Sequence, residues 1–239
     1  MQPPQDDIYS LINESCLQVK ERDVFIITSK ILAIHQGRCI PINEIRNKDA
    51  LIEKEADVFI PRCECPGEHV ILTIKKHTLI PSSGIDESNG NGYFILWPRQ
   101  PFKSASLIWE YLRKKYRRTK LGVIITDSHI APLQWGTRGR AISWCGVEPL
   151  KNYIDTPDIF GRHLHATKAS MIDGLAAAAV AVMGEGNEQT PLAIIRDVPF
   201  VAFRNEPPDQ KEVDGLCISL KDDIYAPILT SVSWHKKDI

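Results

Sequence analysis

Short apolar runs rich in β-branched residues alternate along this chain with segments of helical periodicity, and this alternation limits the possible folds most strongly. The short runs predict buried strands, because β-branched side chains pack well in a sheet and polar loops bound each run. The predicted strands cover residues 23–27, 69–74, 93–97 and 121–126. Apolar residues three and four positions apart predict helices over residues 7–19 and 104–117, and the alanine-rich segment 173–183, which stops at Gly184, predicts another. Strands and helices mixed in this way predict a mixed α/β (α+β) fold.

Some of these segments also predict individual apolar positions. The first helix has them at Ile8, Leu11 and Ile12 and near Cys16. In the strand over 69–74 they alternate, at Val70, Leu72 and Ile74. In the helix over 104–117 they form one face, made of Leu107, Ile108, Tyr111 and Leu112.

Composition limits the class of partner. The chain has 239 residues and a net charge of -1, so no global field favours nucleic acid or an anionic membrane. The basic cluster at residues 113–118 follows a helix, where cations oppose the helix dipole, and nucleic-acid binding is not expected. The longest apolar stretch, Leu175 to Met183, is shorter than the roughly 20 residues that span a bilayer, and the N-terminus lacks signal-peptide features. We expect a cytoplasmic protein with one domain, 1–239, or two small interlocked halves.

Three separate acidic segments carry most of the functional information: Gly84–Asn89, Ile125–Ser128 and Met183–Gly186. Each is predicted to lie where an apolar run ends in a loop. Mg²⁺ and Mn²⁺ bind one or two carboxylates together with substrate phosphate oxygens and water, so scattered acidic residues suit them. Taken singly, each segment is better explained as a solvated turn than as a metal ligand.

Nucleotide binding would need an unusual loop, because no Walker A sequence and no Gly-x-Gly-x-x-Gly helix start is present. The best candidate is the loop from Met183 to Thr190, whose glycines allow backbone N–H groups to approach phosphate. The alternative is a helix stop followed by a polar loop. His163 and His165 could share one strand face, and a half-exposed strand is favoured over a metal site there.

The acidic segments and their surroundings resemble the coenzyme F420-0:γ-glutamyl ligase family, including its bacterial relatives assigned to folate metabolism. The resemblance runs from about Asp23 to about Asp197. Its landmarks are the segments 28–30, 37–38, 84–89, 123–128, 158–162 and 183–186. Several landmarks in one order are more specific than any single motif.

The resemblance implies a ligase built as an intertwined homodimer around a mixed α/β core. It implies that Asp86, Asp127 and Glu185 bind divalent cations, Mg²⁺ or Mn²⁺, with Ser128 adding a hydroxyl oxygen. It further implies that GTP, or ATP, contacts a set of residues from several segments: Ser29, Lys30, Asn89, Met183, Gly184, Glu185, Gly186, Asn187 and Thr190. Asp86, Asp127 and Lys30 are the predicted catalytic residues.

The expected reaction forms an amide between L-glutamate and a γ-carboxylate. Phosphoryl transfer from the nucleotide converts the carboxylate into an acyl phosphate, and the amino group of L-glutamate then displaces phosphate. Lys30 or Arg38 is a candidate to hold a substrate carboxylate. Arg38 is equally expected as a surface residue after the Gly37 turn.

The loop after Asp127 departs from the family pattern, because Ala131 and Gln134 stand where F420-0 ligases carry arginines. Each lost charged contact would cost about 1.5–3 kcal/mol, which favours a reduced folate over F420-0 as acceptor. Trp135 is predicted either to stack on a pterin or aminobenzoyl ring or to lie in the core. A folate-type γ-glutamyl ligase is therefore the main hypothesis. F420-0:L-glutamate ligase is the alternative, and a non-catalytic nucleotide-binding protein is the second alternative.

Overall fold

The computed structural model describes residues 1–15 and 18–236 and divides them into two compact units. Unit 1 comprises Met1–Ile8, Ala33–Arg99 and the described part of Asp209–Ile239. Unit 2 comprises Tyr9–Leu32 and Gln100–Pro208. Helices and strands are mixed in the chain, which confirms the predicted mixed α/β class.

Unit 2 contains the larger sheet, in the order β11-β1-β7-β8. Its strands are β1 (Asp23–Thr28), β7 (Leu121–Ile130), β8 (Thr137–Cys145) and β11 (Leu192–Arg196). β1 pairs in parallel with β7 and antiparallel with β11, while β7 and β8 form a hairpin. The predicted strands over 23–27 and 121–126 are confirmed. β7 extends past the predicted end at Thr126, because its pairing with β8 continues to Ile130.

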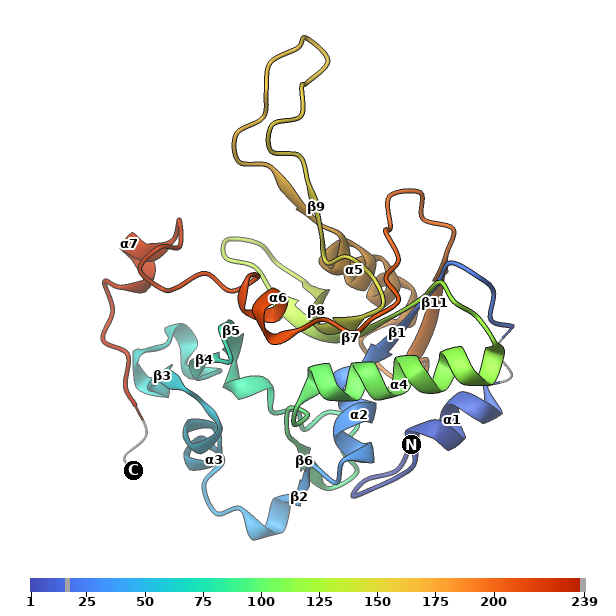
Figure 1. The fold of residues 1–239 in the computed structure, drawn as a ribbon. Coiled ribbons are helices and arrows are strands. Elements are labelled where there is room, and N and C mark those ends of the chain that lie inside the picture. The colour runs from blue at the N-terminus through green and yellow to red at the C-terminus, as the bar shows by residue number, and fades with distance from the viewer. Residues whose placement is uncertain (16–17, 237–239) are drawn as a thin grey trace. The chain divides into compact units, whose positions relative to one another are not determined.

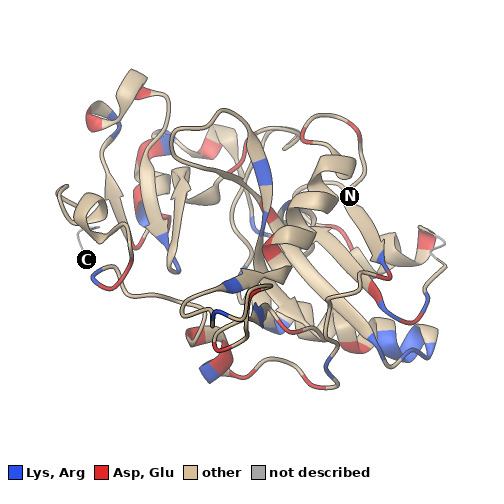
Figure 2. Cartoon of the chain, turned by 90° about the horizontal axis from the view of Figure 1, so that it is seen from above, with Lys and Arg blue, Asp and Glu red and all other residues tan. Residues whose placement is uncertain are grey.

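Helices α4 (Pro101–Tyr116) and α5 (Met171–Met183) cover opposite faces of this sheet (Figure 1). α4 buries Ala105, Ile108, Trp109 and Leu112. Leu107, predicted to be buried, is 49% exposed, because the helix turns Trp109 inward instead, where its indole donates to the Leu121 carbonyl at 2.8 Å. Basic residues gather at the C-terminal end of α4 (Figure 2).

Two shorter helices flank β1. α1 (Ile8–Glu14) is shorter than the predicted helix over 7–19, and Cys16 lies outside the described residues. Ile8 and Ile12 are fully buried on α1, as their helical spacing predicts. α2 (Ser29–His35) starts directly after β1.

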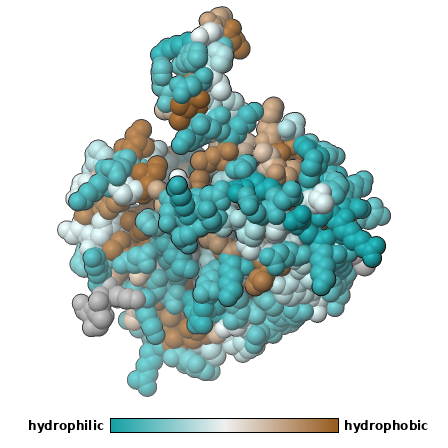
Figure 3. Space-filling view, viewed as in Figure 1, coloured by the Kyte–Doolittle hydropathy of each residue, from teal (hydrophilic) through white to brown (hydrophobic). Residues whose placement is uncertain are grey.

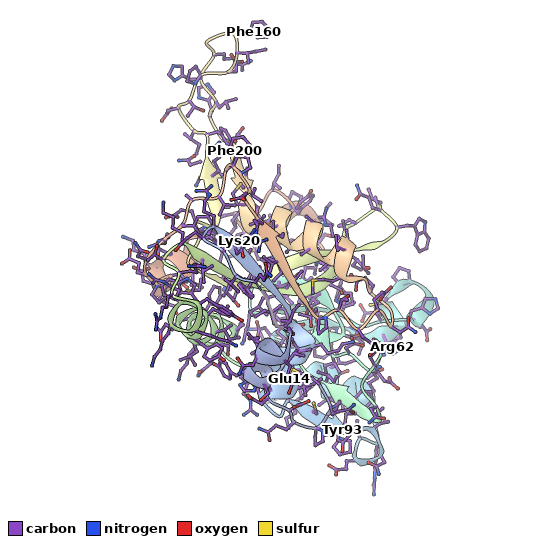
Figure 4. The ribbon with its side chains drawn as sticks, turned by 90° about the vertical axis from the view of Figure 1, so that its right-hand side faces the viewer. Glu14, Lys20, Arg62, Tyr93, Phe160 and Phe200 are labelled. Carbon is purple, nitrogen blue, oxygen red and sulfur yellow. The ribbon has the colours of Figure 1, made fainter. Side chains whose placement is uncertain are left out.

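A long arm extends from the sheet of unit 2 between β9 (Leu150–Asn152) and β10 (Lys168–Ser170) (Figure 1). Beyond these strands, scattered backbone hydrogen bonds hold its two sides together. Phe160 lies at the far end of the arm (Figure 4). The predicted strand carrying His163 and His165 is wrong: only His163 makes an isolated bridge, to Pro157, and both histidines are exposed.

Unit 1 contains smaller sheets and short helices. Its antiparallel sheets have the orders β3-β4-β5 and β2-β6. The strands are β2 (Cys39–Pro41), β3 (Val58–Ile60), β4 (Leu72–Lys75), β5 (Thr78–Pro81) and β6 (Tyr93–Ile95). The α-helices are α3 (Lys48–Glu55), α6 (Gln210–Asp214) and α7 (Ala226–Leu229). The 3-10 turns are η1 (Ile42–Glu44), η2 (Arg62–Glu64), η3 (Pro66–Glu68) and η4 (Ser82–Gly84). Its main apolar cluster includes Ile52, Phe59, Ile71 and Phe94.

β4 reverses the predicted burial of its residues. Val70 lies outside the strand and is 39% exposed, and Leu72 and Ile74 are only half-buried. The buried residues are Thr73 and Lys75, because each has polar partners. The Thr73 hydroxyl donates to the Ile80 carbonyl and Lys75 pairs with Glu55. The predicted strand over 93–97 ends at Ile95, although the next two residues are buried.

Within the described residues, we find no helix that combines the length and the apolar character needed to cross a membrane. Apolar side chains still reach the surface, and one such group lies on the arm (Figure 3).

Candidate active site at the carboxyl edge of the sheet

The parallel pairing of β1 and β7 brings Ser29 and Asp127 together. Thr28 is the register partner of Thr126, so the next residue of each chain segment lies at the same edge of the sheet. Ser29 donates its hydroxyl to Asp127 Oδ1 at 3.0 Å, and the Ser128 backbone N–H donates to the same oxygen at 3.0 Å. Ligands commonly bind outside the carboxyl ends of parallel strands, so this edge is the natural place for a site.

Glu185 reaches the same edge from the end of α5. The Ser128 hydroxyl donates to Glu185 Oε2 at 2.6 Å. Ser128 faces α5 because its register partner, Gly139, packs against that helix: an added Cβ there would lie 2.4 Å from the Ala176 carbonyl oxygen. α5 ends at Gly184, whose φ of +82° turns the chain toward this edge. Ser29, Asp127, Ser128 and Glu185 are hereafter the carboxyl-edge cluster.

The predicted nucleotide loop begins at Met183 and runs beside this cluster to β11. Thr28 donates its N–H to the Pro191 carbonyl at 3.1 Å, which ties the end of the loop to the end of β1. Glu188 accepts the Gly186 N–H at 2.8 Å, and the Thr190 hydroxyl donates to the Met183 carbonyl. The Met183 side chain is buried, whereas residues 185–190 are exposed. The loop is therefore closed by its own hydrogen bonds and presents Asn187 to solvent.

Asp86 and Asn89 lie in unit 1. Asp86 pairs through its backbone with Ile95, and its Oδ1 accepts both the N–H and the hydroxyl of Ser88 at 2.8 Å. Asn89 has a φ of +54°, a conformation that asparagine tolerates better than most residues. These bonds fix a tight acidic turn. A shared metal role for Asp86 with Asp127 and Glu185 stays a prediction.

Of the two candidate cations for a substrate carboxylate, Arg38 is already paired. Its Nη2 lies 2.7 Å from Glu55 Oε2, its Nε donates to the Trp97 carbonyl, and its side chain is 12% exposed. The expectation of a surface residue is therefore wrong. Lys30 is half-buried in the first turn of α2, and its predicted role stays a prediction.

The donor atoms of the carboxyl-edge cluster are all oxygens. Hard cations such as Mg²⁺ and Mn²⁺ prefer oxygen ligands and usually complete their shell with phosphate and water. No three His, Cys, Asp or Glu side chains of the described chain come close enough together to hold a metal. The cluster thus fits a cation shared with a bound phosphate better than one held by protein ligands alone.

A further polar group lies on the other face of the β7–β8 hairpin, and the sequence analysis did not identify it. In the register of β7 and β8, Asp127 lies opposite Arg140 and His129 lies opposite Arg138. These four side chains therefore share one face of the hairpin, and Ser128 and Gly139 lie on the other. Burial lowers the pKa of His129, and the charges of Arg140 and Arg138 lower it further. The sequence signal that could have identified this group is the alternation Arg138-Gly139-Arg140. On a strand it places both arginines on one face, which becomes the face of Asp127 once the hairpin forms.

Trp135 lies in the turn of this hairpin and is 105% exposed. The core alternative for Trp135 is therefore wrong. The neighbouring Gln134 is also exposed, and no charged side chain replaces it in this turn, residues 131–136.

Comparisons with known proteins agree with these landmarks. The family model described as F420-0:Gamma-glutamyl ligase matches residues 3–197. The coenzyme F420:L-glutamate ligase of Methanosarcina mazei is 33% identical over 213 residues, covering 82% of this chain and 81% of the relative. The protein of the same name from Methanococcus maripaludis strain S2 is 35% identical over 204 residues, covering 80% and 82%. That from Methanopyrus kandleri is 32% identical over 222 residues, covering 86% of each.

Proposed function

Because this chain belongs to the F420-0:γ-glutamyl ligase family, we propose that it joins L-glutamate in amide linkage to an acceptor of the coenzyme F420-0 type, using GTP or ATP. The aligned region covers more than four fifths of each of these three relatives, and all three carry the name coenzyme F420:L-glutamate ligase. This supports F420-0 over the folate-type acceptor that the loop after Asp127 suggested.

The observation that carries the proposal is the carboxyl-edge cluster. Asp127 and Glu185 are 58 positions apart in the chain, and Ser128 links them at the edge of the sheet. Two carboxylates and hydroxyl oxygens suit a divalent cation, and the glycine-containing loop beside them suits the phosphates of a nucleoside triphosphate.

The proposed reaction has two steps. An oxygen of the acceptor carboxylate attacks the γ-phosphorus, giving an acyl phosphate and the nucleoside diphosphate. The amino group of L-glutamate, after losing its proton, attacks the acyl carbon, and inorganic phosphate leaves as the amide forms. A divalent cation held by Asp127, Glu185 and the Ser128 hydroxyl, with Asp86 as a further predicted ligand, would neutralise phosphate charge. Ser29 holds Asp127 in orientation through its hydroxyl.

A reduced folate is the second candidate acceptor, and one observation favours it. The turn of the β7–β8 hairpin offers no arginine for a phosphodiester, since Ala131 and Gln134 occupy those positions. It offers instead the fully exposed ring of Trp135, a flat apolar surface on which a pterin could stack.

We also propose a homodimer, and the arm of unit 2 supports it. Ile159 and Phe160 are 91% and 89% exposed at its end, and apolar side chains exposed in this way are typical of protein interfaces. Light scattering should give twice the chain mass for the wild type. The I159S/F160S double variant should be a monomer, while Val182→Ser, which changes an 83% exposed residue on α5, should remain dimeric. A monomeric wild type would refute the dimer.

The decisive test of the activity is mass spectrometry of reaction mixtures. Purified protein is incubated with L-glutamate, Mg²⁺ or Mn²⁺, and GTP or ATP, with F420-0 and tetrahydrofolate offered separately. An F420-0 product heavier by one glutamyl unit, absent with Asp127→Ala, is the expected result. Product with tetrahydrofolate alone would establish the second candidate. Nucleotide binding without either product would refute both and favour a non-catalytic nucleotide-binding protein.

A further inference from the structure

Two guanidinium groups on β8 have no carboxylate partner among residues 1–15 and 18–236. Arg138 and Arg140 lie two positions apart on β8 and share one face, while Gly139 between them lies on the opposite face. Neither guanidinium forms an ion pair or a side-chain hydrogen bond within the described part of unit 2. Asp127, the register partner of Arg140, accepts from the Ser29 hydroxyl and from the Ser128 N–H.

A third polar group on this face also lacks a partner. Nδ1 of His129, the register partner of Arg138, is buried and has no hydrogen bond in the described structure. Buried polar atoms are nearly always hydrogen-bonded, so this nitrogen can accept or donate a bond to a bound molecule. His129 lies directly opposite Arg138. Asp127, two residues before His129 on β7, lies opposite Arg140. The unpartnered groups thus form one continuous patch.

We propose that Arg138 and Arg140 bind the two carboxylates of the incoming L-glutamate. Successive same-face positions on a strand lie about 7 Å apart, so two guanidiniums can each face one end of a small dicarboxylate. Two positive charges match the two carboxylates, and a guanidinium can bind a carboxylate through two parallel hydrogen bonds. The ammonium group then points along the strand pair toward Asp127, beside which the acyl phosphate of the proposed function would form.

This assignment gives a second interpretation of Ala131 and Gln134, which stand where F420-0 ligases carry arginines. The turn has no arginine at these two positions, but the strand that follows it carries Arg138 and Arg140. L-Glutamate is common to both candidate acceptors. The assignment therefore rests on the proposed ligase activity but not on which acceptor is used.

The test combines kinetics with direct binding. Arg138→Ala and Arg140→Ala should each raise the KM for L-glutamate about 10- to 100-fold, the loss expected for one charge-assisted contact, with the KM for nucleotide and acceptor unchanged. Arg138→Lys and Arg140→Lys should recover part of this loss, because lysine keeps the charge but not the bidentate geometry. Lys114→Ala, which removes one exposed charge from α4 of the same unit, is the matched control and should change nothing.

Calorimetric titration with L-glutamate alone separates this proposal from the activity. If the wild type binds L-glutamate and both alanine variants do not, the assignment holds even where no acceptor is turned over. Unchanged glutamate binding in the R138A/R140A double variant would overturn it. A rise confined to the KM for nucleotide or for acceptor would also overturn it, and would assign the arginines to a phosphate or to the acceptor instead.

Discussion

Two clusters of charged and hydroxyl side chains show how the same residue types serve different purposes. In unit 1, Glu55 Oε2 lies 2.7 Å from both Lys75 Nζ and Arg38 Nη2, and all three side chains are less than one fifth exposed. In unit 2, the carboxylates of the carboxyl-edge cluster contact hydroxyls and backbone N–H groups at the edge of a sheet. In the first cluster two cations pair with one carboxylate, whereas in the second Ser128 donates to two carboxylates, Asp127 and Glu185.

The pKa shifts of Glu55 and Lys75 show how closely the charged groups of the cluster in unit 1 interact. Burial alone raises the pKa of Glu55, but the hydrogen bond and charge of Lys75, with the charge of Arg38, outweigh it and hold that pKa below its usual value. Burial lowers the pKa of Lys75, and its pairing with Glu55 opposes this shift. The cluster in unit 1 is thus a closed network whose loss should affect stability, while loss of the carboxyl-edge cluster should affect activity.

The largest expected effect is on catalysis. Asp127→Asn keeps the size of the side chain and its bond from Ser29 but removes the charge. We expect kcat/KM to fall on the order of 1000-fold, equivalent to about 4 kcal/mol, with little change in Tm. Initial-rate kinetics and a thermal melt measure the two quantities. Glu14→Gln, which removes an exposed carboxylate at the end of α1, is the control, and an Asp127→Asn variant as active as this control would contradict the assignment.

The next effect is on stability. Glu55→Gln leaves Lys75 and Arg38 buried without a countercharge and should lower the free energy of unfolding by about 3 kcal/mol. Because the folded-state pKa of Glu55 is depressed, its contribution is fully present above its ordinary value of 4.5 and is lost as pH falls through the folded-state pKa.

Melts over a pH series check this prediction. The gap between wild type and Glu55→Gln should narrow below about pH 4.5. A gap that stays constant to the acid limit would show that Glu55 acts by packing and not by its charge.

A smaller effect is expected for Ser128→Ala, which removes the hydroxyl that reaches Glu185. Loss of one hydrogen bond to a charged group should reduce kcat/KM about tenfold. Ser128→Thr, which keeps the hydroxyl, should recover most of the activity in the same assay. Equal loss in both variants would mean that the space around Ser128, and not its oxygen, matters.

The smallest effect should come from an exposed ion pair in unit 1. Lys48 lies 2.8 Å from Glu87, with side chains 37% and 50% exposed, so solvent weakens their attraction. Lys48→Ala should change the free energy of unfolding by less than about 1 kcal/mol. A chemical denaturation curve gives this value, and an effect as large as that of Glu55→Gln would remove the distinction between closed and solvated clusters.

Much of the fold could be predicted from local pattern. The β-branched run at Asp23–Ile27 forms β1, and the alanine-rich segment that stops at Gly184 forms α5. These predictions succeeded because the apolar pattern of each segment agrees with the way it is buried. The face of β4 could not be predicted, because Thr73 and Lys75 are buried only through partners elsewhere in the chain, such as Glu55.

The candidate site was predicted in part. The family landmarks contained Ser29, Asp127, Ser128 and Glu185, and the structure places them at one edge of a sheet. Arg138 and Arg140 were missed, because a strand's pairing register, and hence its neighbours on a face, is not visible in local sequence. The metal role of Asp86 and the nucleotide contact of Asn89 remain predictions.

The sequence by itself determined β1, the first part of β7, α4 and α5, the family and the identity of the acidic residues, since these depend on local periodicity and on motifs read in order. Only the tertiary structure decided which charged side chains pair with one another and which acidic residues meet at the edge of the sheet. That decision depends on pairing across long stretches of chain, such as β1 with β7 and Ser128 with Glu185. A carboxylate's environment, and therefore its role, is set by the neighbours that folding brings to it.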